Sequence, residues 1–421
     1  LIRRRAETTA CLITLDSTPD RPRPLARRFA RTRIDLFFPL LDSDPDTWTR
    51  GKMAMRVTIV GAGIAGLSTA WPLSKLGHDI TLIEQGSIPN PLAASGDRHR
   101  MIRRAYGDAD GYARTISEAF DSWDLLWNDL GVSHYANCGV LGISQHAGDG
   151  AADFRTGLDR MKFEYELLDP QEAAGRYPFL DPATFRYAYF DHDGGALFSE
   201  RIARDMKAWL KMRGADIRTH AKVLAVDAHA ASVRIDDDTI IRADRLVVTA
   251  GAWTLQLFPA LAENLMTYRN AVAYMEPPAD LADAWSNAPA IVDIGGDSGG
   301  YVLPPSDDIG LKFGAGVHKS RAPDPDANRD ATPGEGDSLR RLFSPPLSRI
   351  NEYTVTEVKT CIYTFTADSR FFSKRLGNTL VVSACSGHGY KFGAAVGRRV
   401  AQALETDDDT MLARWLRAEA R

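Results

Sequence analysis

The chain has 421 residues, of which 44% are hydrophobic and 25% charged, so it can bury a large core and form roughly two or three domains. The formal net charge is −4, which gives no overall attraction to nucleic acid or to anionic membranes. No run of about 18 apolar residues is present, so we expect no membrane-spanning segment. The cysteines, Cys11, Cys138, Cys361 and Cys385, lack the spacing of a zinc site or a disulfide framework, which favours a reducing, cytoplasmic compartment and no metal.

Residues 1–54 differ in composition from the rest of the chain. They are rich in Arg and Pro, and their apolar run is short. Acidic residues throughout the segment argue against an organelle transit peptide, and no apolar region leads into a secretory cleavage site. We therefore predict a disordered or non-native leader in front of the folded part.

Residues 55–85, MRVTIVGAGIAGLSTAWPLSKLGHDITLIEQ, contain the strongest local motif. An apolar strand leads into Gly61-x-Gly63-x-x-Gly66 and an apolar helix, and a second strand then ends before Glu84. The first glycine permits a tight turn, the second lets a pyrophosphate approach the backbone, and the third lets helix and strand pack closely. The carboxylate can accept hydrogen bonds from a ribose, and the helix N-terminus attracts the phosphates. The complete unit predicts a dinucleotide site.

Two later segments repeat the pattern of an apolar strand followed by small residues. They are ADRLVVTAGAWT at 243–254, and NTLVVSACSGHGYKFGAAVGRRVAQAL at 378–404, in which we predict a helix from about Phe392. Three such elements, spread over most of the chain, suit a long dinucleotide that is bound by a discontinuous domain. FAD fits this arrangement better than a nicotinamide cofactor, which usually binds to one continuous domain.

From Met55 onward the chain resembles the sarcosine oxidase and N-methyltryptophan oxidase group of the D-amino-acid-oxidase-like flavoproteins. Four stretches carry the resemblance: VGAGIAGLSTA, RMIRRAYGD, KTCIYTFTAD and SGHGYKFG. The resemblance implies an α/β fold (α+β overall), in which a mainly antiparallel β-sheet substrate domain is inserted into a Rossmann-like FAD-binding domain. We expect the FAD-binding domain at 55–137, 196–265 and 360–421, and the substrate domain at 138–195 and 266–359.

The resemblance also implies a set of FAD-binding residues and a covalent bond between FAD and the sulfur of Cys361. A thiolate is the attacking species in such a bond, and the nearby cation of Lys359 would favour it. From residue chemistry alone, a buried thiol in a strand is the alternative explanation of Cys361. The implied FAD-binding residues are Gly61, Gly63, Ile64, Ala65, Gly66, Glu84, Gln85, Ser95, Arg100, Val223, Ala250, Gly251, Trp253, Cys361, Gly387, His388, Gly389 and Lys391.

A basic cluster at 98–104 and a later lysine are the candidates for binding a substrate carboxylate. At helical spacing Arg100 and Arg103 would share a face, and a solvated basic surface is the alternative. The resemblance implies that both arginines lie near the flavin and that Arg103 binds the carboxylate, a task that suits a planar guanidinium. Lys391 begins a helix, where the helix dipole disfavours a cation, and the resemblance makes it the second carboxylate ligand. Alternatively, Lys391 extends to solvent.

Lys312 lies in the predicted strand–turn–strand segment YVLPPSDDIGLKFGAG. The resemblance implies that it lies near the flavin and promotes electron transfer to oxygen, for which a fixed positive charge is suited. Tyr301 and Tyr363 match tyrosines of the substrate pocket. A histidine of the family is replaced here by Gly316, and His318 is the nearest candidate for its role.

We therefore expect an FAD-dependent amine oxidase that acts on an amino acid with an N-methylated or cyclic secondary amine. The C–N bond becomes an imine, and O₂ becomes H₂O₂. We expect a monomer or dimer, with no nucleic-acid or membrane partner. The alternatives are a dehydrogenase of the same fold with a protein electron acceptor, an NAD(P)-dependent oxidoreductase, and a flavin-binding protein without catalysis.

Overall fold

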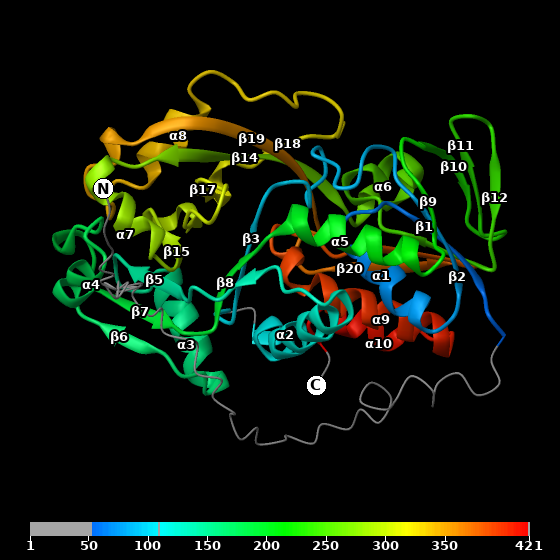
Figure 1. The fold of residues 1–421 in the computed structure, drawn as a ribbon, viewed down its shortest axis with the longest axis horizontal. Coiled ribbons are helices and arrows are strands. Elements are labelled where there is room, and N and C mark those ends of the chain that lie inside the picture. The colour runs from blue at the N-terminus through cyan, green and yellow to red at the C-terminus, as the bar shows by residue number, and fades with distance from the viewer. Residues whose placement is uncertain (1–52, 108–109, 420–421) are drawn as a thin grey trace, which may run out of the picture. The chain divides into compact units, whose positions relative to one another are not determined.

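The dinucleotide motif forms the centre of a six-stranded sheet (Figure 1). The computed structural model describes residues 53–107 and 110–419, so the predicted leader lies outside the described residues except at 53–54. The strand order is β20–β21–β13–β1–β2–β9, and all neighbours are parallel except β20 and β21. The strands are β1 (Arg56–Val60), β2 (Asp79–Ile83), β9 (Asp216–Arg218), β13 (Arg245–Val248), β20 (Phe372–Leu376) and β21 (Thr379–Ser383).

Helices cover this sheet because their apolar faces need burial. α1 and α9 approach so closely that a Cβ on Gly397 would lie 1.9 Å from the carbonyl oxygen of Ser68. Together with α2, α5 and α10 they enclose one apolar core that includes Trp123 and Trp415. These helices are α1 (Ile64–Lys75), α2 (Asp110–Leu130), α5 (Ser199–Met212), α9 (Gly393–Thr406) and α10 (Thr410–Leu416).

A nine-stranded sheet forms a second layered region with its own apolar core. Its neighbours are antiparallel except for the parallel pair β15 and β5. The strands are β5 (Val140–Ser144), β6 (Glu166–Leu168), β7 (Tyr187–Asp191), β14 (Met266–Glu276), β15 (Ala290–Ile294), β16 (Gly300–Leu303), β17 (Leu311–Ala315), β18 (Ser320–Arg321) and β19 (Thr354–Phe365). The associated helices are α3 (Gly150–Met161), α4 (Pro170–Arg176), α7 (Ala282–Ser286) and α8 (Glu335–Leu342).

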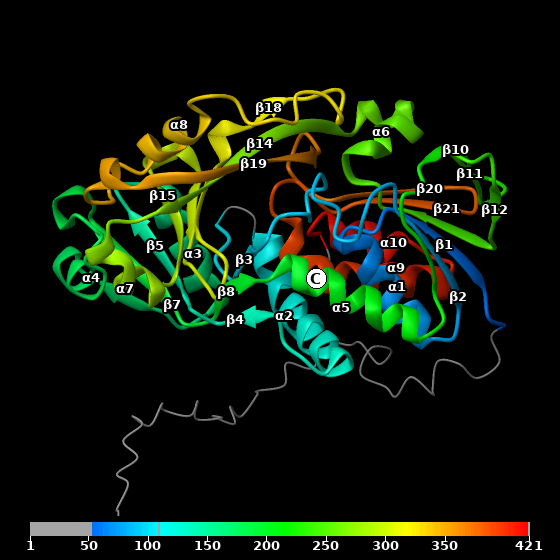
Figure 2. The ribbon, with the colours of Figure 1, turned by 45° about the horizontal axis from the view of Figure 1, so that its top comes forward.

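The long strands β14 and β19 pair along their whole length and connect the two sheets, as Figure 2 shows. β19 runs across the expected domain boundary at residue 360, so this boundary falls within a strand rather than in a loop. Two three-stranded sheets, α6 (Thr254–Leu257) and several short 3₁₀ helices complete the described part. The small sheets consist of β10 (Val223–Asp227), β11 (Ser232–Ile235) and β12 (Ile240–Arg242), and of β3 (Arg100–Arg103), β8 (Gly194–Leu197) and β4 (Tyr135–Ala136).

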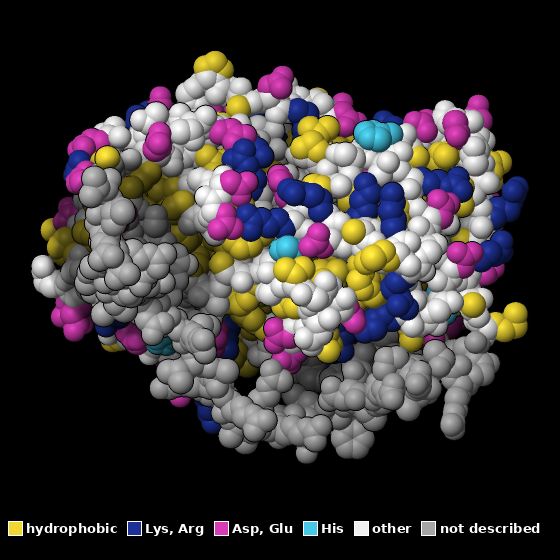
Figure 3. Space-filling model, in the orientation of Figure 1, with side chains coloured by type: hydrophobic (Ala, Val, Ile, Leu, Met, Phe, Trp, Pro, Cys, Tyr) yellow, Lys and Arg dark blue, Asp and Glu magenta, His cyan; other side chains and the backbone are white. Residues whose placement is uncertain are grey.

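The predicted fold class is confirmed: a parallel α/β layer and a mainly antiparallel sheet are both present. The helical spacing proposed for Arg100 and Arg103 is wrong, because these residues form strand β3, which pairs with β8. Within the described residues, no helix is both long and apolar enough to cross a bilayer. On the face drawn in Figure 3, basic and acidic side chains are interspersed.

Candidate functional site

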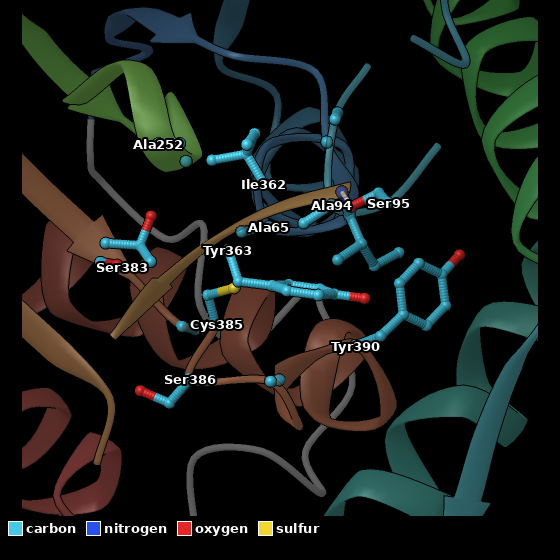
Figure 4. A pocket seen from close by; sticks show the side chains of 18 of the residues that line it. Ala65, Ala94, Ser95, Ala252, Ile362, Tyr363, Ser383, Cys385, Ser386 and Tyr390 are labelled. Atoms are coloured by element: carbon cyan, nitrogen blue, oxygen red, sulfur yellow. Dashed lines mark hydrogen bonds between the residues drawn. The ribbon is translucent and has the colours of Figure 1, made fainter. Parts of the chain in front are cut away.

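A cavity of about 460 Å³ lies between the two large sheets, at the carboxyl ends of β1, β2 and β21. Ligands of open α/β sheets bind at this edge. The opposite wall comes from β14, β15, β16, β17 and β19 of the nine-stranded sheet. Figure 4 shows side chains from distant parts of the sequence around this cavity, among them those of Ser95, Ile362, Tyr363 and Tyr390.

The turn between β1 and α1 packs so closely that only glycine fits at Gly61 in the turn and at Gly66 at the start of α1. Gly61 has a φ of +98°, and a Cβ there would lie 2.6 Å from the carbonyl oxygen of Thr249. A Cβ on Gly66 would lie 1.9 Å from the carbonyl oxygen of Gly61. Gly63 lines the cavity directly, so the backbone is open to a ligand at the start of α1.

Replacing Gly66 with Ala tests this packing. The added methyl forces the turn away from the helix, so we expect less FAD to be incorporated and the melting temperature to fall. Gly175→Ala in α4 is the matched control, because a Cβ there meets nothing within 4 Å. That control should keep its FAD and its melting temperature. Flavin absorbance after gel filtration and a thermal melt check both variants, and a Gly66→Ala protein like the wild type would contradict the packing argument.

Glu84 lies at the end of β2 and lines the cavity, as predicted. Its carboxylate accepts hydrogen bonds from the backbone N–H of Ala62 at 2.9 Å and of Gly86 at 3.1 Å, and from Asn90 Nδ2 at 2.9 Å. These bonds fix an acceptor beside the glycine turn, where a ribose would need one.

The structure brings most of the predicted residues to this cavity. The predicted residues that line it are Gly61, Gly63, Ile64, Ala65, Glu84, Gln85, Ser95, Arg100, Arg103, Val223, Ala250, Gly251, Trp253, Tyr301, Lys312, Tyr363, Gly387, His388, Gly389 and Lys391. Gly66, Cys361 and His318 do not line it. Gly66 packs against the turn instead, and His318 ends a short 3₁₀ helix, Gly316–His318, in which Gly316 lines the cavity. The structure therefore gives His318 no contact with the cavity.

Arg103 and Lys391 place two basic side chains in the cavity. The Arg103 guanidinium carbon lies 4.7 Å from the ring centroid of Tyr106 and 4.3 Å from that of Phe154. Within the described residues, the buried Nη1 of Arg103 has no hydrogen-bond partner, and Lys391 Nζ donates only to the carbonyl oxygen of His388, at 3.0 Å. Burial and then the charge of Arg103 hold the pKa of Lys391 well below its usual value. Among the residues that the structure describes, no acidic side chain forms an ion pair with either group, although Asp293 of the same cavity is close enough to interact electrostatically with Arg103.

Buried charges are normally paired, so this arrangement favours an anion that comes from outside the chain. A planar guanidinium and an ammonium together suit a carboxylate.

Lys312 is 1% exposed in strand β17 and also lines the cavity. Burial lowers its pKa to about 8, although Asp97 opposes the shift. Its Nζ forms an ion pair with Asp97 and donates to the carbonyl oxygen of His99 at 3.0 Å. Tyr301 and Tyr363 line the same cavity. Burial raises the pKa of both phenols, which therefore stay protonated.

Cys361 is buried in β19, and its Sγ lies 3.9 Å from Nη2 of Arg100, which does line the cavity. A second thiol, Cys385, lines the cavity itself (Figure 4). Burial raises the pKa of the Cys385 thiol. The structure thus offers two cysteines close to the predicted flavin, where the sequence indicated one.

The sequence interpretation also missed two carboxylates. Asp97 lies within the basic cluster, and an acid among arginines was a usable signal. Asp293 lines the cavity with a φ of 53°, at an irregularity in the pairing of β15 with β16. Burial, then the charge of Asp149, raises the pKa of Asp293 to about 6. No sequence motif marks this position.

The family model described as "FAD dependent oxidoreductase" matches residues 56–403. Human peroxisomal sarcosine oxidase is 27% identical over 81% of this chain and 89% of its own. Monomeric sarcosine oxidase of Bacillus sp. (strain B-0618) is 27% identical over 82% of this chain and 91% of its own. N-methyl-L-tryptophan oxidase of Yersinia pestis (strain Pestoides F) is 25% identical over 80% of this chain and 92% of its own.

Among solved structures, the fold is similar to L-proline dehydrogenase from P. horikoshii, with a TM-score of 0.73, 18% identity, and coverage of 87% of this chain and 97% of the other. The amino acid oxidase NikD (Tyr258Phe mutant) has a TM-score of 0.73 at 19% identity, with coverage of 88% and 97%. At these identities the likeness shows the fold alone. Three features of the cavity itself fit FAD: the glycine turn, the oriented Glu84 carboxylate and the third glycine segment around Gly387.

Proposed function

Because the chain belongs to the FAD dependent oxidoreductase (DAO) family, we propose that it oxidises the C–N bond of an amino acid that carries a secondary amine, with O₂ as electron acceptor. The chain is an FAD-dependent oxidoreductase of the sarcosine oxidase type, whose relatives act on CH–NH donors. The substrate and the use of oxygen are the proposal. The single observation that carries it is that two basic side chains, Arg103 and Lys391, line the FAD cavity without an ion-pair partner among the described residues.

In the proposed complex, Arg103 and Lys391 bind the substrate carboxylate. Anchoring that end of the substrate fixes the position of the amine and of the carbon beside it, which lowers the entropic part of the barrier. Bound FAD supplies the redox chemistry, since it takes up a hydride equivalent and later passes two electrons to O₂. The substrate loses that hydride and its N–H proton to become an imine, and water hydrolyses the imine. An amine that binds neutral requires no side-chain base, and we assign none.

Lys312 is proposed to promote the reaction with oxygen. Lys312 lines the cavity and is buried from bulk water. A fixed positive charge in such a buried site stabilises the negative charge that develops on O₂ far better than the same charge would in solvent. The two protons and two electrons that reach O₂ give H₂O₂.

A peroxide-coupled screen over matched pairs tests the proposal. Each pair consists of an amino acid and the same amine without the carboxylate: sarcosine with dimethylamine, N-methyltryptophan with N-methyltryptamine, and proline with pyrrolidine. We expect peroxide from at least one amino acid and little from its partner. Equal rates within a pair would refute the carboxylate site. Substrate-dependent bleaching without peroxide in air would instead indicate the dehydrogenase, and colourless purified protein the nicotinamide alternative.

We further propose that FAD is bound covalently through Cys361. Its support is the KTCIYTFTAD stretch and the position of Cys361 beside the cavity residue Arg100. After acid precipitation, flavin should stay in the pellet for wild type and for Cys385→Ser, and should be released into the supernatant for Cys361→Ser. Release from wild type would exclude covalent attachment. Release from Cys385→Ser alone would show that the covalent bond is to Cys385 and not to Cys361.

A further inference from the structure

Asp97 lies directly behind the cavity wall and joins residues from several elements. It is 2% exposed and does not line the cavity. Its Oδ2 accepts from Lys312 of β17 and, at 2.7 Å, from Nη1 of Arg100 of β3. Its Oδ1 accepts from the hydroxyl of Tyr274 of β14 at 2.6 Å. Its backbone carbonyl accepts from the hydroxyl of Ser199, the first residue of α5.

The sheet register explains why these groups converge. Tyr274 and Lys312 are direct partners in the antiparallel pair β14–β17, so both side chains leave the sheet on the same side. The Asp97 carboxylate therefore receives two donors from one face of this sheet, and the guanidinium of Arg100 comes from β3 of a separate sheet. Each of its oxygens has a donor, as a buried carboxylate requires.

This cluster contains two cationic side chains, Lys312 and Arg100, and one carboxylate, Asp97. Burial alone would raise the pKa of Asp97, but Lys312 and Arg100 outweigh it and hold that pKa well below its usual value. One ionised carboxylate is thus shared by two cations, so the cluster keeps a net positive charge towards the cavity. Asp97 also offsets the burial of Lys312, which would otherwise favour the neutral amine.

We propose that Asp97 is a positioning residue, whose carboxylate keeps the Lys312 ammonium charged and fixes it at the cavity wall for the reaction with oxygen. This inference rests on the role of Lys312 in the proposed function. Asp97 itself touches neither the cavity nor the reacting atoms.

Other ionisable groups around the cluster do not replace Asp97. The imidazole of His99 stacks on Tyr274, with ring centroids 6.1 Å apart, and burial followed by the charge of Lys312 keeps its pKa well below the usual value. The guanidinium carbon of Arg98 lies 4.7 Å from the ring centroid of Tyr274, and Arg98 pairs with Glu357 at 2.7 Å. Tyr301, whose ring centroid is 5.9 Å from Lys312 Nζ, and Tyr363 remain neutral phenols. Asp97 is the ionised carboxylate that reaches Lys312 among the residues described.

Asp97→Asn tests the proposal, because it removes the charge and keeps the shape. The wild-type rate of flavin reoxidation should be high at low pH and fall as the pH rises through about 8, where Lys312 loses its proton. In Asp97→Asn this fall should occur about two to three pH units lower, which slows reoxidation at neutral pH by roughly tenfold or more. Lowering the pH should restore the rate. A purely structural role would not produce such recovery.

A second readout needs no turnover. Acetic anhydride modifies neutral amines, and mass spectrometry of the resting enzyme reports acetylation of Lys312 at each pH, with the exposed Lys211 as the reference. The onset should lie near pH 8 in the wild type and lower in Asp97→Asn. Identical onsets and identical reoxidation profiles would overturn the proposal. If Asp97→Asn does not fold, the wild type alone tests the proposal: acetylation of Lys312 that begins at pH 6 or below would overturn it.

These results separate the two claims. If Lys312→Met reoxidises as fast as wild type, the oxygen role of Lys312 in the proposed function fails. The acetylation profile of Asp97→Asn would still show whether Asp97 holds the charge.

Discussion

Lys312→Met slows the reaction of the reduced enzyme with oxygen by about 10²–10³-fold, the usual cost of removing one preorganised electrostatic contact. Methionine nearly matches the length of the lysine side chain but carries no charge. Because the ammonium acts on oxygen in our account and not on the substrate, reduction of the flavin by substrate should change little. Stopped-flow absorbance measures the two half-reactions separately.

Lys312→Arg is the matched control, since it keeps the positive charge beside Asp97. It should recover a large part of the oxygen rate that Lys312→Met loses. A Lys312→Met protein whose reduction is slowed as much as its reoxidation would assign Lys312 to substrate binding. Equal loss in Lys312→Met and Lys312→Arg would show that shape and not charge matters.

Arg103→Ala lowers kcat/KM for the amino acid substrate by about 30-fold to several thousand-fold, since breaking a buried charge pair costs about 2–5 kcal/mol. The guanidinium is held between the rings of Tyr106 and Phe154 and has a free Nη1 for the carboxylate. Steady-state peroxide production over a range of substrate concentrations measures the effect, with FAD content determined for each preparation.

Two controls accompany this variant. Arg104→Ala removes the neighbouring arginine, which pairs with Asp193 and does not line the cavity, and should leave kcat/KM unchanged. The weak reaction of the matched amine without a carboxylate should be the same in wild type and Arg103→Ala. A similar loss with both compounds would mean that Arg103 supports the site structurally.

Local motifs could identify the glycine-rich turn beside the cavity, because close backbone packing requires glycine at specific positions. Gly61 and Gly66 fit only as glycine, and Glu84 lies where the spacing placed it. The same reasoning failed for Arg100 and Arg103, since spacing within a short segment cannot reveal that β8 pairs with it and makes it a strand.

The parts of the site that depend on distant pairing could not be predicted from the sequence. Asp97 meets Lys312 only because β14 and β17 bring the lysine to it across more than 200 residues of chain. Asp293 points into the cavity because of an irregularity in strand pairing, which has no local signature. The resemblance identified Lys312 and Lys391, but not the partners that set their charge.

The most direct test of the account is to mix the oxidised enzyme, without air, with the best amino acid of the screen and separately with its carboxylate-free partner. We predict that the amino acid bleaches the flavin, that the partner leaves it yellow on the same timescale, and that admitted air restores the colour with formation of H₂O₂. Equal bleaching by both compounds, or no bleaching by any amino acid, would contradict the central claim that Arg103 and Lys391 bind a substrate carboxylate beside FAD.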